Sequence, residues 1–475
     1  MIKACCCPTT NTPLKKRKIA PNPKQRRATT APPLPPSDCA INKSINKQYE
    51  SHPRLDSTMS NYRRMRILVV GSGGREHALC WKLAQEAEVV CAPGNAGIAT
   101  DVECVNIPTN DFHSLLTLIR ERSIELVVVG PEDPLVGGLA DAVRDAGVPC
   151  FGPGRQGAQL EGSKAFCKAM MQRAGVPTAD YQVFIDADAA KAYAKDYYAQ
   201  GKKLAIKASG NALGKGVIVA ETAEEAFSGI DTLKALGEAG KTLVLEQKHE
   251  GPEYSLLTIT NGKDIYSLPV AQDYKRIFDG DQGPNTGGMG TYSPVSWVDA
   301  ALVKLTEEAV VLPVLETLRE DGIEYRGVLF SGLMLTSEGP KCLEYNVRFG
   351  DPETQSVISR LGTGFAAALA ACAAGEPIPE IEVHSDAAVT VVAASEGYPG
   401  DYQKGLPIEF GEISQNVKVF HAGTTKSNGA IVTNGGRVLA VTATAATQEQ
   451  ARKDAYTALQ QIRFDGMYAR KDIGA

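Results

Sequence analysis

From residue 66 onward, short apolar runs alternate with segments that have the spacing of an amphipathic helix. The first unit has the fully apolar run 67–70, then a glycine-rich loop at 71–76, then a helical pattern. Strands without a polar face are buried on both sides, which is typical of parallel sheets covered by crossover helices. The alternation therefore predicts an α/β fold that begins with a doubly wound parallel sheet.

The same pattern divides the chain into four parts. Helix-like and strand-like segments continue from about residue 162, and a smaller set of strands follows from about residue 387. The turn signals Gly375 and Pro377 separate these two sets. We therefore expect a disordered N-terminal extension at 1–64, an N-terminal domain at 65–166, a two-part central domain at 167–376 with a lid at about 178–246, and a small C-terminal α+β domain at 377–475.

Residues 1–64 differ from the rest of the chain in composition. They carry thirteen Lys and Arg against three Asp and Glu, include the proline-rich run 31–36, and lack hydrophobic periodicity. Such a segment cannot bury a core, so we expect it to be disordered. Three explanations remain open: an organelle transit peptide, a nuclear-type basic signal, or upstream sequence before a true start at Met59 or Met65.

The composition of the remaining residues excludes several classes of protein. They carry 37 Lys and Arg against 52 Asp and Glu, so the body is acidic, whereas nucleic-acid binding needs a basic face. The most apolar helical run, 364–374, is too short to cross a membrane. The cysteines after residue 64 form no CxxC pair and the histidines form no HExxH pattern. We therefore expect reduced thiols in a cytosol-like compartment and no zinc hydrolase.

The glycine loop after the first strand is one candidate ligand site. Gly71-x-Gly73 before a helix presents backbone N–H groups and a helix N-terminus to an anion, and Arg75 adds a guanidinium suited to phosphate. The loop matches the dinucleotide-binding motif only weakly, because Glu76 stands where that motif has its third glycine. The alternative explanation is a tight structural turn.

Two further glycine-rich segments could approach a ligand. Residues 210–216 have three residues between the first two glycines instead of the four of a phosphate-binding loop, and no Ser or Thr follows Lys215. Because they lie between two predicted strands, a flap that closes over phosphates fits better, and a solvated hairpin tip is the alternative. Residues 283–290 are so rich in glycine that close approach of backbone to a ligand is expected, although a plain loop is also open.

The segment 341–353 gives the most specific indication of a chemical function. In a strand, the period of two puts Glu344 and Asn346 on one face. A carboxylate and an amide oxygen side by side suit Mg²⁺ that bridges ATP phosphates, and Arg348 continues that face. The alternative is an edge strand with a solvated polar face, but Cys342 fits that alternation poorly.

Taken together, these segments resemble the ATP-grasp superfamily and, within it, the glycinamide ribonucleotide synthetase family. The ordered set of motifs is specific, whereas no single glycine loop is. The resemblance covers residues 66–475, and residues 1–64 have no counterpart in the family. The motifs that carry it lie at residues 70–78, 92–97, 130–132, 160–164, 284–290, 348–354, 419–424, 434–438 and 470–474.

The resemblance implies that the central domain is of the ATP-grasp type and holds ATP between the lid and a larger subdomain. The chain departs from the family pattern at Ser209, Gln247, Lys248 and Tyr274. The implied contacts with ATP are Lys164, Lys207, Gly214, Lys215, Gly216, Glu246 and Glu253, and the implied ligands of Mg²⁺ or Mn²⁺ are Glu344 and Asn346.

The resemblance also implies roles in binding the two other substrates. The phosphate of phosphoribosylamine would sit on Gly73, Gly74 and Arg75, and its sugar near Asn95 and Glu132. Arg348, Lys215 and Asp273 are the implied catalytic residues. The glycine and acyl-phosphate region would be shaped by Asp273, Lys275, Thr286, Gly287, Gly288, Met289, Arg348 and Asp351.

The activity that this family implies is ligation of glycine to 5-phosphoribosylamine in de novo purine biosynthesis, with ATP converted to ADP and phosphate through a glycyl phosphate. We expect a monomer in the cytoplasm, or an organelle protein if residues 1–64 are a targeting segment, without nucleic-acid or membrane partners. The alternatives are another ATP-grasp carboxylate–amine ligase, a nicotinamide-dependent oxidoreductase and a non-catalytic nucleotide sensor. Arg75, Asn95 and Glu132 disfavour the first, Glu76 the second, and the Glu344/Asn346 pair the third.

Overall fold

The computed structural model describes residues 65–211 and 216–475. Its first sheet is parallel throughout, with the strand order β3-β2-β1-β4-β5. The chain runs from β1 through β2 to β3 on one side and then crosses to β4 and β5 on the other, so the predicted doubly wound sheet is confirmed. The elements are β1 (Arg66–Gly71), α2 (Gly74–Leu83), β2 (Glu88–Pro93), α3 (Ile98–Asp101), β3 (Glu103–Cys104), α4 (Phe112–Glu121), β4 (Leu126–Val129), α5 (Glu132–Gly137), α6 (Leu139–Asp145) and β5 (Cys150–Phe151).

The reversal of strand order brings two loops to one edge of this sheet. β1 and β4 are neighbours, with Val70 paired to Val129, and the chain leaves both strands at this edge. In open α/β sheets, ligands bind at the carboxyl ends of the strands where the order reverses. The loop after β1 leads to Arg75 in the first turn of α2, and the loop after β4 leads directly to Glu132, the first residue of α5.

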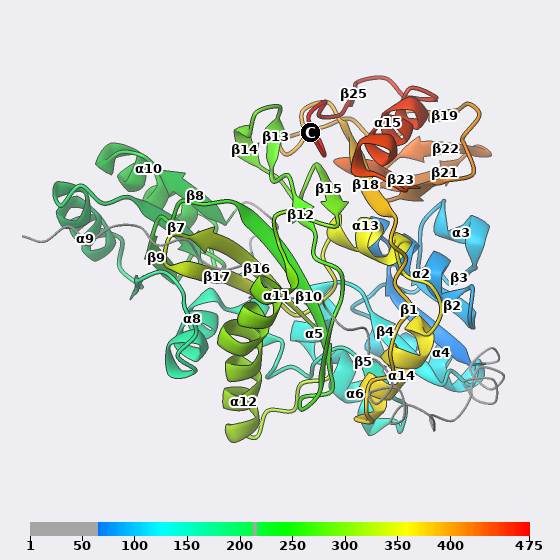
Figure 1. Cartoon of the computed structure of the whole chain (residues 1–475), viewed down its shortest axis with the longest axis horizontal. Coiled ribbons are helices and arrows are strands. Elements are labelled where there is room, and N and C mark those ends of the chain that lie inside the picture. Colours follow the sequence, from blue (N-terminus) through cyan, green and yellow to red (C-terminus); the bar gives the residue numbers. More distant parts are fainter. Residues whose placement is uncertain (1–64, 212–215) are drawn as a thin grey trace, which may run out of the picture. The chain divides into compact units, whose positions relative to one another are not determined.

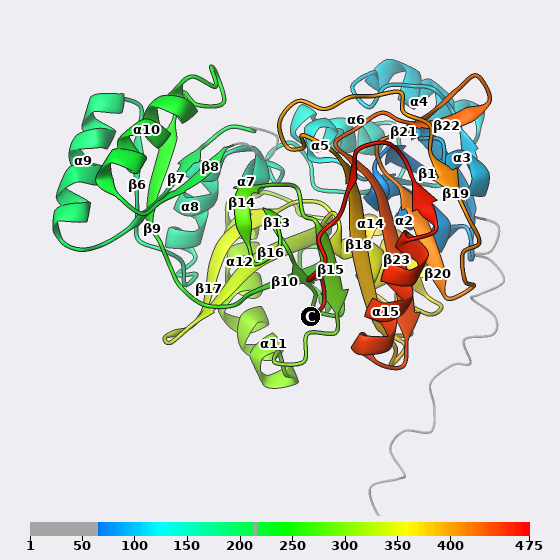
Figure 2. The same cartoon turned by 90° about the horizontal axis from the view of Figure 1, so that it is seen from above.

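A second, antiparallel sheet has the strand order β6-β9-β7-β8. Helices α9 and α10 lie side by side on it (Figures 1 and 2). Ile206, Ile230 and Leu245 belong to a hydrophobic cluster confined to these strands and helices, so this small unit has its own core. The elements are α7 (Gln159–Gly162), α8 (Lys164–Arg173), β6 (Tyr181–Phe184), α9 (Ala187–Ala199), β7 (Leu204–Ala208), β8 (Val217–Ala220), α10 (Ala223–Lys234) and β9 (Leu243–Gln247).

A third sheet is antiparallel and has the order β11-β10-β16-β17. Strand β17 contains a bulge, because Gly332 pairs with Glu344 and Leu333 pairs with Cys342, which leaves Leu343 unmatched. Helices α11 and α12 flank a short π-helical turn, η2. The elements are β10 (Glu253–Thr260), β11 (Ile265–Ser267), α11 (Ala300–Thr306), η2 (Glu307–Val311), α12 (Leu312–Glu320), β16 (Gly327–Thr336) and β17 (Gly339–Asn346).

The fourth large sheet joins the central and C-terminal parts of the chain. Its order is β12-β15-β18-β23-β20, and β25 also pairs with β18. β15 precedes the turn at Gly375 and β18 follows it, and the two strands pair from Gly290↔Val391 to Ser293↔Ala388. One sheet therefore contains strands from both parts. Helix α15 packs on β18 and β23 (Figure 2). The elements are β12 (Gln272–Asp273), β13 (Arg276–Phe278), β14 (Gln282–Asn285), β15 (Gly290–Ser293), α13 (Glu353–Ser359), α14 (Phe365–Ala374), β18 (Ala387–Ser395), β19 (Glu409–Phe410), β20 (Val417–His421), β21 (Thr424–Ser427), β22 (Ala430–Thr433), β23 (Arg437–Ala445), α15 (Gln448–Leu459), β24 (Ile462–Arg463) and β25 (Met467–Tyr468).

The last residues of the chain hold the β13–β14 hairpin. Arg470 is only 1% exposed and donates a hydrogen bond to the carbonyl oxygen of Arg276 at 3.0 Å. The same side chain forms an ion pair with Asp281 at 2.9 Å. Asp472 accepts a hydrogen bond from the backbone N–H of Gly280 at 2.8 Å. The hairpin is therefore fixed by contacts far away in sequence rather than by its own two short strands.

The cysteines and the most apolar helix of this fold bear on two of the predictions. All seven cysteines in the described part of the chain are free thiols, and all but the half-buried Cys104 are buried. The apolar run that ends at Ala374 forms α14, which packs inside the protein as predicted. Within residues 65–211 and 216–475, no helix combines the length and the apolar character that a bilayer-spanning helix needs.

Candidate active site

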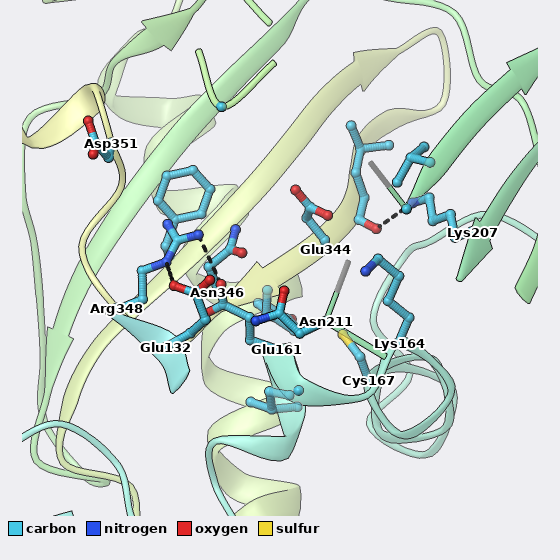
Figure 3. A pocket seen from close by; sticks show the side chains of 18 of the residues that line it. Glu132, Glu161, Lys164, Cys167, Lys207, Asn211, Glu344, Asn346, Arg348 and Asp351 are labelled. Carbon is cyan, nitrogen blue, oxygen red and sulfur yellow. Dashed lines mark hydrogen bonds and ion pairs between the residues drawn. The ribbon is translucent and has the colours of Figure 1, made fainter. Parts of the chain in front are cut away.

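A cavity of about 600 Å³ is lined by residues from all the larger parts of the described chain. Figure 3 shows one region of it, in which Lys164 and Lys207 lie on one side of Glu344, and Asn346 and Arg348 lie on the other. The predicted site residues that line it are Arg75, Glu132, Lys164, Lys207, Gly216, Asp273, Lys275, Thr286, Gly287, Glu344, Asn346, Arg348 and Asp351.

A second cavity, of about 470 Å³, adjoins the first. Lys207, Asp273, Lys275 and Glu344 line both cavities. Glu246 and Glu253, both predicted to contact ATP, line only the second one, where the end of β9 and the two residues after it also lie. The two cavities together form one elongated site.

The side chains of Glu344 and Asn346 face the first cavity, as the period of two predicts. Both residues are half-buried, while Tyr345 between them is 1% exposed and its hydroxyl donates a hydrogen bond to the carbonyl oxygen of Val310 at 2.6 Å. Cys342 is fully buried, although strict alternation would place it on the face of Glu344. The bulge at Leu343 shifts the alternation by one residue, which explains the poor fit of Cys342 in the sequence pattern.

Cations surround the Glu344 carboxylate. Burial would raise the pKa of Glu344, but the charges of Lys275 and Lys207, and then of Lys164 and Arg348, outweigh it and lower that pKa. Glu344 is therefore ionised at neutral pH. A carboxylate and an amide oxygen on one face, with cations that can meet phosphate oxygens, fit a divalent ion that bridges ATP phosphates.

Lys207 is held by two partners in this site. Its ammonium group forms an ion pair with Glu246 and donates a hydrogen bond to the carbonyl oxygen of Leu343 at 3.3 Å. Glu246 is 3% exposed and also pairs with Lys168 at 2.5 Å. The Leu343 carbonyl is the one that the bulge in β17 removes from the regular ladder, so the bulge links Lys207 to the strand of Glu344.

The start of α8 brings Lys164 to the cavity. The Ser163 hydroxyl caps this helix by accepting a hydrogen bond from Phe166 N, and the Lys164 N–H donates to the carbonyl oxygen of Ser209 at 2.9 Å. The Ser209 hydroxyl also accepts from Ala165 N at 3.0 Å. Ser209, one of the departures from the family pattern, therefore ties the N-terminus of α8 to the end of β7. Gly214 and Lys215, the predicted flap residues, lie outside the described residues.

Arg348 is paired with two carboxylates from the N-terminal part of the chain. Its guanidinium lies 3.4 Å from Glu132 Oε2 and 2.9 Å from Glu161 Oε1. Burial would raise the pKa of Glu132, but Arg348 and Arg75 lower it. Burial raises the pKa of Glu161 to about 7, even though Arg348 opposes that rise. Sequence reasoning missed Glu161, although it lies within the family motif at 160–164.

Two acids, Asp273 and Glu353, line the same cavity. Burial raises the pKa of Asp273 to about 7, and the carboxylate of Glu353 adds to that rise; burial also raises the pKa of Glu353. Lys275 lies nearby, but its ammonium group donates to Glu253 Oε2 at 2.5 Å. Glu353 is 4% exposed and accepts a hydrogen bond from the Ser255 hydroxyl at 3.2 Å. An acid held near neutrality in this way can accept a proton during a reaction.

The loop after β1 is closed by the side chain that replaces the third glycine of the dinucleotide motif. Glu76 Oε2 accepts a hydrogen bond from Gly73 N at 2.6 Å, and Glu76 Oε1 pairs with Arg75 Nε at 2.5 Å. A side chain on Gly71 or on Gly130 would collide with Glu76. The carboxylate therefore fills the space beside Gly71 and Gly130, while Arg75 still lines the cavity.

Asn95 does not join the other predicted substrate residues. Its amide nitrogen donates to the carbonyl oxygens of Ser72 at 2.8 Å and His421 at 2.7 Å. Its amide oxygen accepts from Gly97 N and Ile98 N, both at 2.9 Å. The side chain lines a separate cavity of about 500 Å³, so it ties the N-terminal part to β20 instead of facing Glu344.

The glycine-rich loop before β15 is packed differently from the prediction. Met289 is fully buried against Ile277 and lines no part of the first cavity. Gly288 N donates to the Thr286 hydroxyl at 2.9 Å, so this N–H is not free for a ligand. A side chain on Gly288 would collide with Pro352. Close packing of protein against protein, rather than approach to a ligand, explains this glycine.

Two residues from the C-terminal part of the chain line the cavity and were not predicted. They are Tyr398 and Arg437, and both contact the loop that contains Gly287. Arg437 lies within the family motif at 434–438, which was the one available signal. Tyr398 lies outside every motif, and sequence alone offered no sign of it.

Comparisons with known proteins give a consistent result across the described chain. Family models for phosphoribosylglycinamide synthetase match residues 65–161 (N domain), 162–354 (ATP-grasp domain) and 388–475 (C domain). A curated protein of Rhodopirellula baltica, named phosphoribosylamine–glycine ligase, is 46% identical over 429 residues, which covers 87% of this chain and 98% of the relative.

Solved structures agree with this result. The crystal structure of phosphoribosylamine–glycine ligase from Thermotoga maritima has a TM-score of 0.76 and 36% identity, and the match covers 86% of this chain and all of that one. The biotin carboxylase domain of 2-oxoglutarate carboxylase from Hydrogenobacter thermophilus, solved with MgADP, has a TM-score of 0.65 and 19% identity. That match covers 85% of this chain and 91% of the other, and at this identity it shows a shared fold alone.

Proposed function

The chain belongs to the phosphoribosylglycinamide synthetase family, and from that premise we propose how its residues divide the work of the reaction. The protein is an ATP-dependent phosphoribosylamine–glycine ligase of purine biosynthesis, with a central part of the ATP-grasp type. It uses ATP and a divalent metal ion. The observation that carries the residue assignments is the placement of Glu344 and Asn346 on one cavity-facing strand among four cationic side chains.

ATP would lie across both cavities, with its phosphates in the first and its adenosine in the second. Lys164 and Lys207 lie on the same side of Glu344 and would contact the phosphates, next to Gly216. The backbone after Glu246 would meet the adenine edge, and Glu253 would hold the ribose hydroxyls. Gly214 and Lys215 would approach the phosphates from the flap.

Glu344 and Asn346 would hold Mg²⁺ or Mn²⁺. Hard oxygen ligands suit both ions, which usually bind through one or two side chains together with substrate phosphates. When bound, the ion neutralises charge on the β- and γ-phosphates. The carboxylate of Glu344, kept ionised by its cationic neighbours, is ready to receive it without loss of a proton.

The other two substrates would bind in two different regions of the site. The phosphate of phosphoribosylamine would meet Gly73, Gly74 and Arg75, and its sugar would meet Glu132. Asn95 is left out of this assignment because its amide is already bonded to protein. Glycine would bind in the region lined by Lys275, Thr286, Gly287, Arg348 and Asp351. Gly288 and Met289 would support that wall from behind.

The reaction would run in two steps. A carboxylate oxygen of glycine attacks the γ-phosphorus of ATP, the bond to the β-phosphate oxygen breaks, and ADP leaves. The amine of phosphoribosylamine then attacks the glycyl carbonyl, and phosphate departs with the oxygen that glycine supplied. Arg348 and Lys215 stabilise the charge of the transferred phosphoryl group. Asp273, whose pKa burial raises, accepts the proton that the amine loses.

We also propose the overall organisation of the protein. The boundaries would fall at 65–166, 167–376 and 377–475, with the lid at about 178–246. We propose a monomer, because one chain supplies the described side chains that line both cavities. The role in purine biosynthesis supports a cytoplasmic location, with organelle targeting through residues 1–64 as the alternative.

A product assay tests the proposed function directly. The protein is incubated with ATP, Mg²⁺, glycine and freshly generated phosphoribosylamine, and the products are analysed by mass spectrometry. Glycinamide ribonucleotide should form only when all four are present, with ADP in equal amount. Hydrolysis of ATP without this product, or product formation with an alternative amine alone, would contradict the assignment.

A further inference from the structure

The Arg437 side chain connects three segments that the sequence keeps far apart. Its Nη1 donates hydrogen bonds to the carbonyl oxygens of Gly287 at 2.6 Å and Asp351 at 2.7 Å, with a longer one to Gly288 at 3.3 Å. Its Nη2 lies 3.2 Å from Asp351 Oδ2. A planar guanidinium can serve these acceptors at once because its donors point in fixed directions.

The neighbouring Tyr398 secures the same loop from the same part of the chain. Gly287 N donates a hydrogen bond to the Tyr398 hydroxyl at 3.0 Å. The carbonyl oxygen of Gly287 is bound by Arg437, so both polar backbone groups of this residue are held by the C-terminal part. The loop leads directly into β15, which pairs with β18 of that part.

The absence of a side chain at position 287 makes this arrangement possible. A Cβ atom on Gly287 would lie 2.9 Å from the Arg437 Cζ atom, which is closer than real Cβ atoms approach. The loop therefore presses against the guanidinium itself. Arg437 acts as part of the wall of the site rather than as a surface residue that reaches toward it.

Arg437 also controls the charge of Asp351 beside the first glycine loop. The Asp351 carboxylate lies 3.7 Å from the position of a Cβ on Gly73 and 3.8 Å from that of a Cβ on Gly74. Burial would raise the pKa of Asp351, but Arg437 and then Arg75 lower it, so the group is a carboxylate at neutral pH. An uncompensated carboxylate at that place would repel a phosphate bound on Gly73 and Gly74.

We propose that Arg437, with Tyr398 beside it, is a positioning residue that fixes the glycine-binding wall and neutralises Asp351 next to the phosphate-binding loop. This role rests on the proposed function and deepens it, because it makes the C-terminal part of the chain a component of acceptor binding. Arg437 acts through Gly287, Gly288 and Asp351. The nucleotide half of the site, around Glu253, lies in the adjoining cavity, which Arg437 does not line.

The test compares steady-state kinetics of Arg437→Met with a matched control. Arg452 is an arginine of the same part of the chain that also donates to two backbone carbonyl oxygens, those of Ile473 at 2.9 Å and Lys471 at 2.7 Å. It does not line the cavity. Arg437→Met should raise the KM for glycine about tenfold or more and lower kcat, with the KM for ATP unchanged. Arg452→Met should leave all three values near those of the wild type.

Two further variants separate positioning from charge and from folding. Arg437→Lys keeps the charge but lacks the fork that reaches several carbonyl groups, so its KM for glycine should stay high. Asp351→Asn in the Arg437→Met background should restore part of the affinity for phosphoribosylamine, because the uncompensated charge is gone. Tyr398→Phe should raise the KM for glycine a few-fold and gives the same test if Arg437→Met fails to fold.

Three results would overturn the proposal. One is an effect of Arg437→Met no larger than that of Arg452→Met. Another is an equal rise in the KM values for ATP and glycine, which would indicate a general structural loss. The third is wild-type kinetics in both Arg437→Lys and Tyr398→Phe. A wild-type protein that makes no glycinamide ribonucleotide would instead refute the proposed function, so the two failures are distinct.

Discussion

The Nη2 atom of Arg348 lies 2.9 Å from Oε1 of Glu161, and the other oxygen of that carboxylate accepts a hydrogen bond from Val347 N at 2.8 Å. Glu161 therefore binds the chain directly after β17, next to the residues that face the proposed metal site. Yet burial raises the pKa of Glu161 to about 7, so its charged form is costly. A structural anchor with such a pKa makes the stability of the protein depend on pH.

Glu161→Gln should reveal this dependence. The folded protein holds the Glu161 proton up to about pH 7, whereas the unfolded chain releases it near the ordinary value of 4.5. The free energy of unfolding thus falls as pH rises between these values, by an amount on the order of 3 kcal/mol from this residue. Glutamine cannot ionise, so the denaturation midpoint of Glu161→Gln relative to wild type should rise from pH 5 to pH 7.5. Parallel curves for the two proteins would contradict the shifted pKa.

Glu344→Gln should lower turnover by about a hundredfold or more at saturating Mg²⁺. The amide keeps the shape of the side chain but removes the charge that binds the metal ion. Glu338→Gln, at the exposed turn that precedes β17, is the matched control and should keep its turnover. The measurement is kcat as a function of Mg²⁺ concentration. Wild-type turnover in Glu344→Gln would remove this residue from the metal site.

Gly288→Ala should damage the acceptor wall more than the fold. Gly288 has a φ of +107°, and an added Cβ would collide with Pro352. We expect kcat/KM for glycine to fall about tenfold to a hundredfold, because small misplacements of a binding wall are costly in catalysis. Gly280→Ala is the control, since Gly280 has a φ of +65° but open space around it. It should lose about 1 kcal/mol of stability and little activity. Equal activity losses in the two variants would argue against a specific role of the Gly288 contact.

The oxygen of the released phosphate identifies the intermediate. When glycine carries oxygen-18 in its carboxylate, the acyl-phosphate route transfers one labelled oxygen to inorganic phosphate and leaves the other in the amide product. A glycyl adenylate would instead put the label into AMP and release pyrophosphate. Mass spectrometry of the two nucleotide products and of phosphate distinguishes these routes. The cations gathered around Glu344, rather than at the adenosine end, favour label in phosphate.

A chain that begins at Met65 should keep its turnover and its denaturation midpoint. Every residue assigned to substrates or metal lies after that position, and β1 starts at Arg66. The measurement is kcat for the full and shortened chains under the same conditions. A large loss of activity in a shortened chain that still folds would give residues 1–64 a part in catalysis.

Local patterns in the sequence predicted most of the fold. The apolar run 67–70 lies within β1, and the apolar run 364–374 forms α14, because apolar runs and turn residues act over a few positions. The face shared by Glu344 and Asn346 follows from the same short-range rule. The bulge at Leu343 could not be predicted, since it depends on the pairing of β17 with β16. Because of that pairing, the side chain of Cys342 is buried in the core.

Residues brought in from distant segments escaped prediction for a physical reason. Arg437 meets Gly287 only because β15 and β18 pair in one register, and no local pattern encodes that register. Glycine at positions 287 and 288 looked like a sign of ligand approach, whereas it makes room for Arg437 and Pro352. Asn95 was predicted to bind sugar, and nothing in the sequence shows that its amide is occupied by backbone groups.

The contact between Asp472 and Gly280 has a consequence for synthesis on the ribosome. The hairpin that borders the nucleotide cavity is made 192 residues before the side chain that fixes it. At a synthesis rate of roughly 5–20 residues per second, about 10–40 s pass between synthesis of the hairpin and synthesis of Arg470 and Asp472. During that time the parallel sheet can fold and the lid can close its own core, but the nucleotide end of the site is still open. Until residues 470–472 have been made, the hairpin therefore lacks the ion pair and the hydrogen bond that fix it beside the nucleotide cavity.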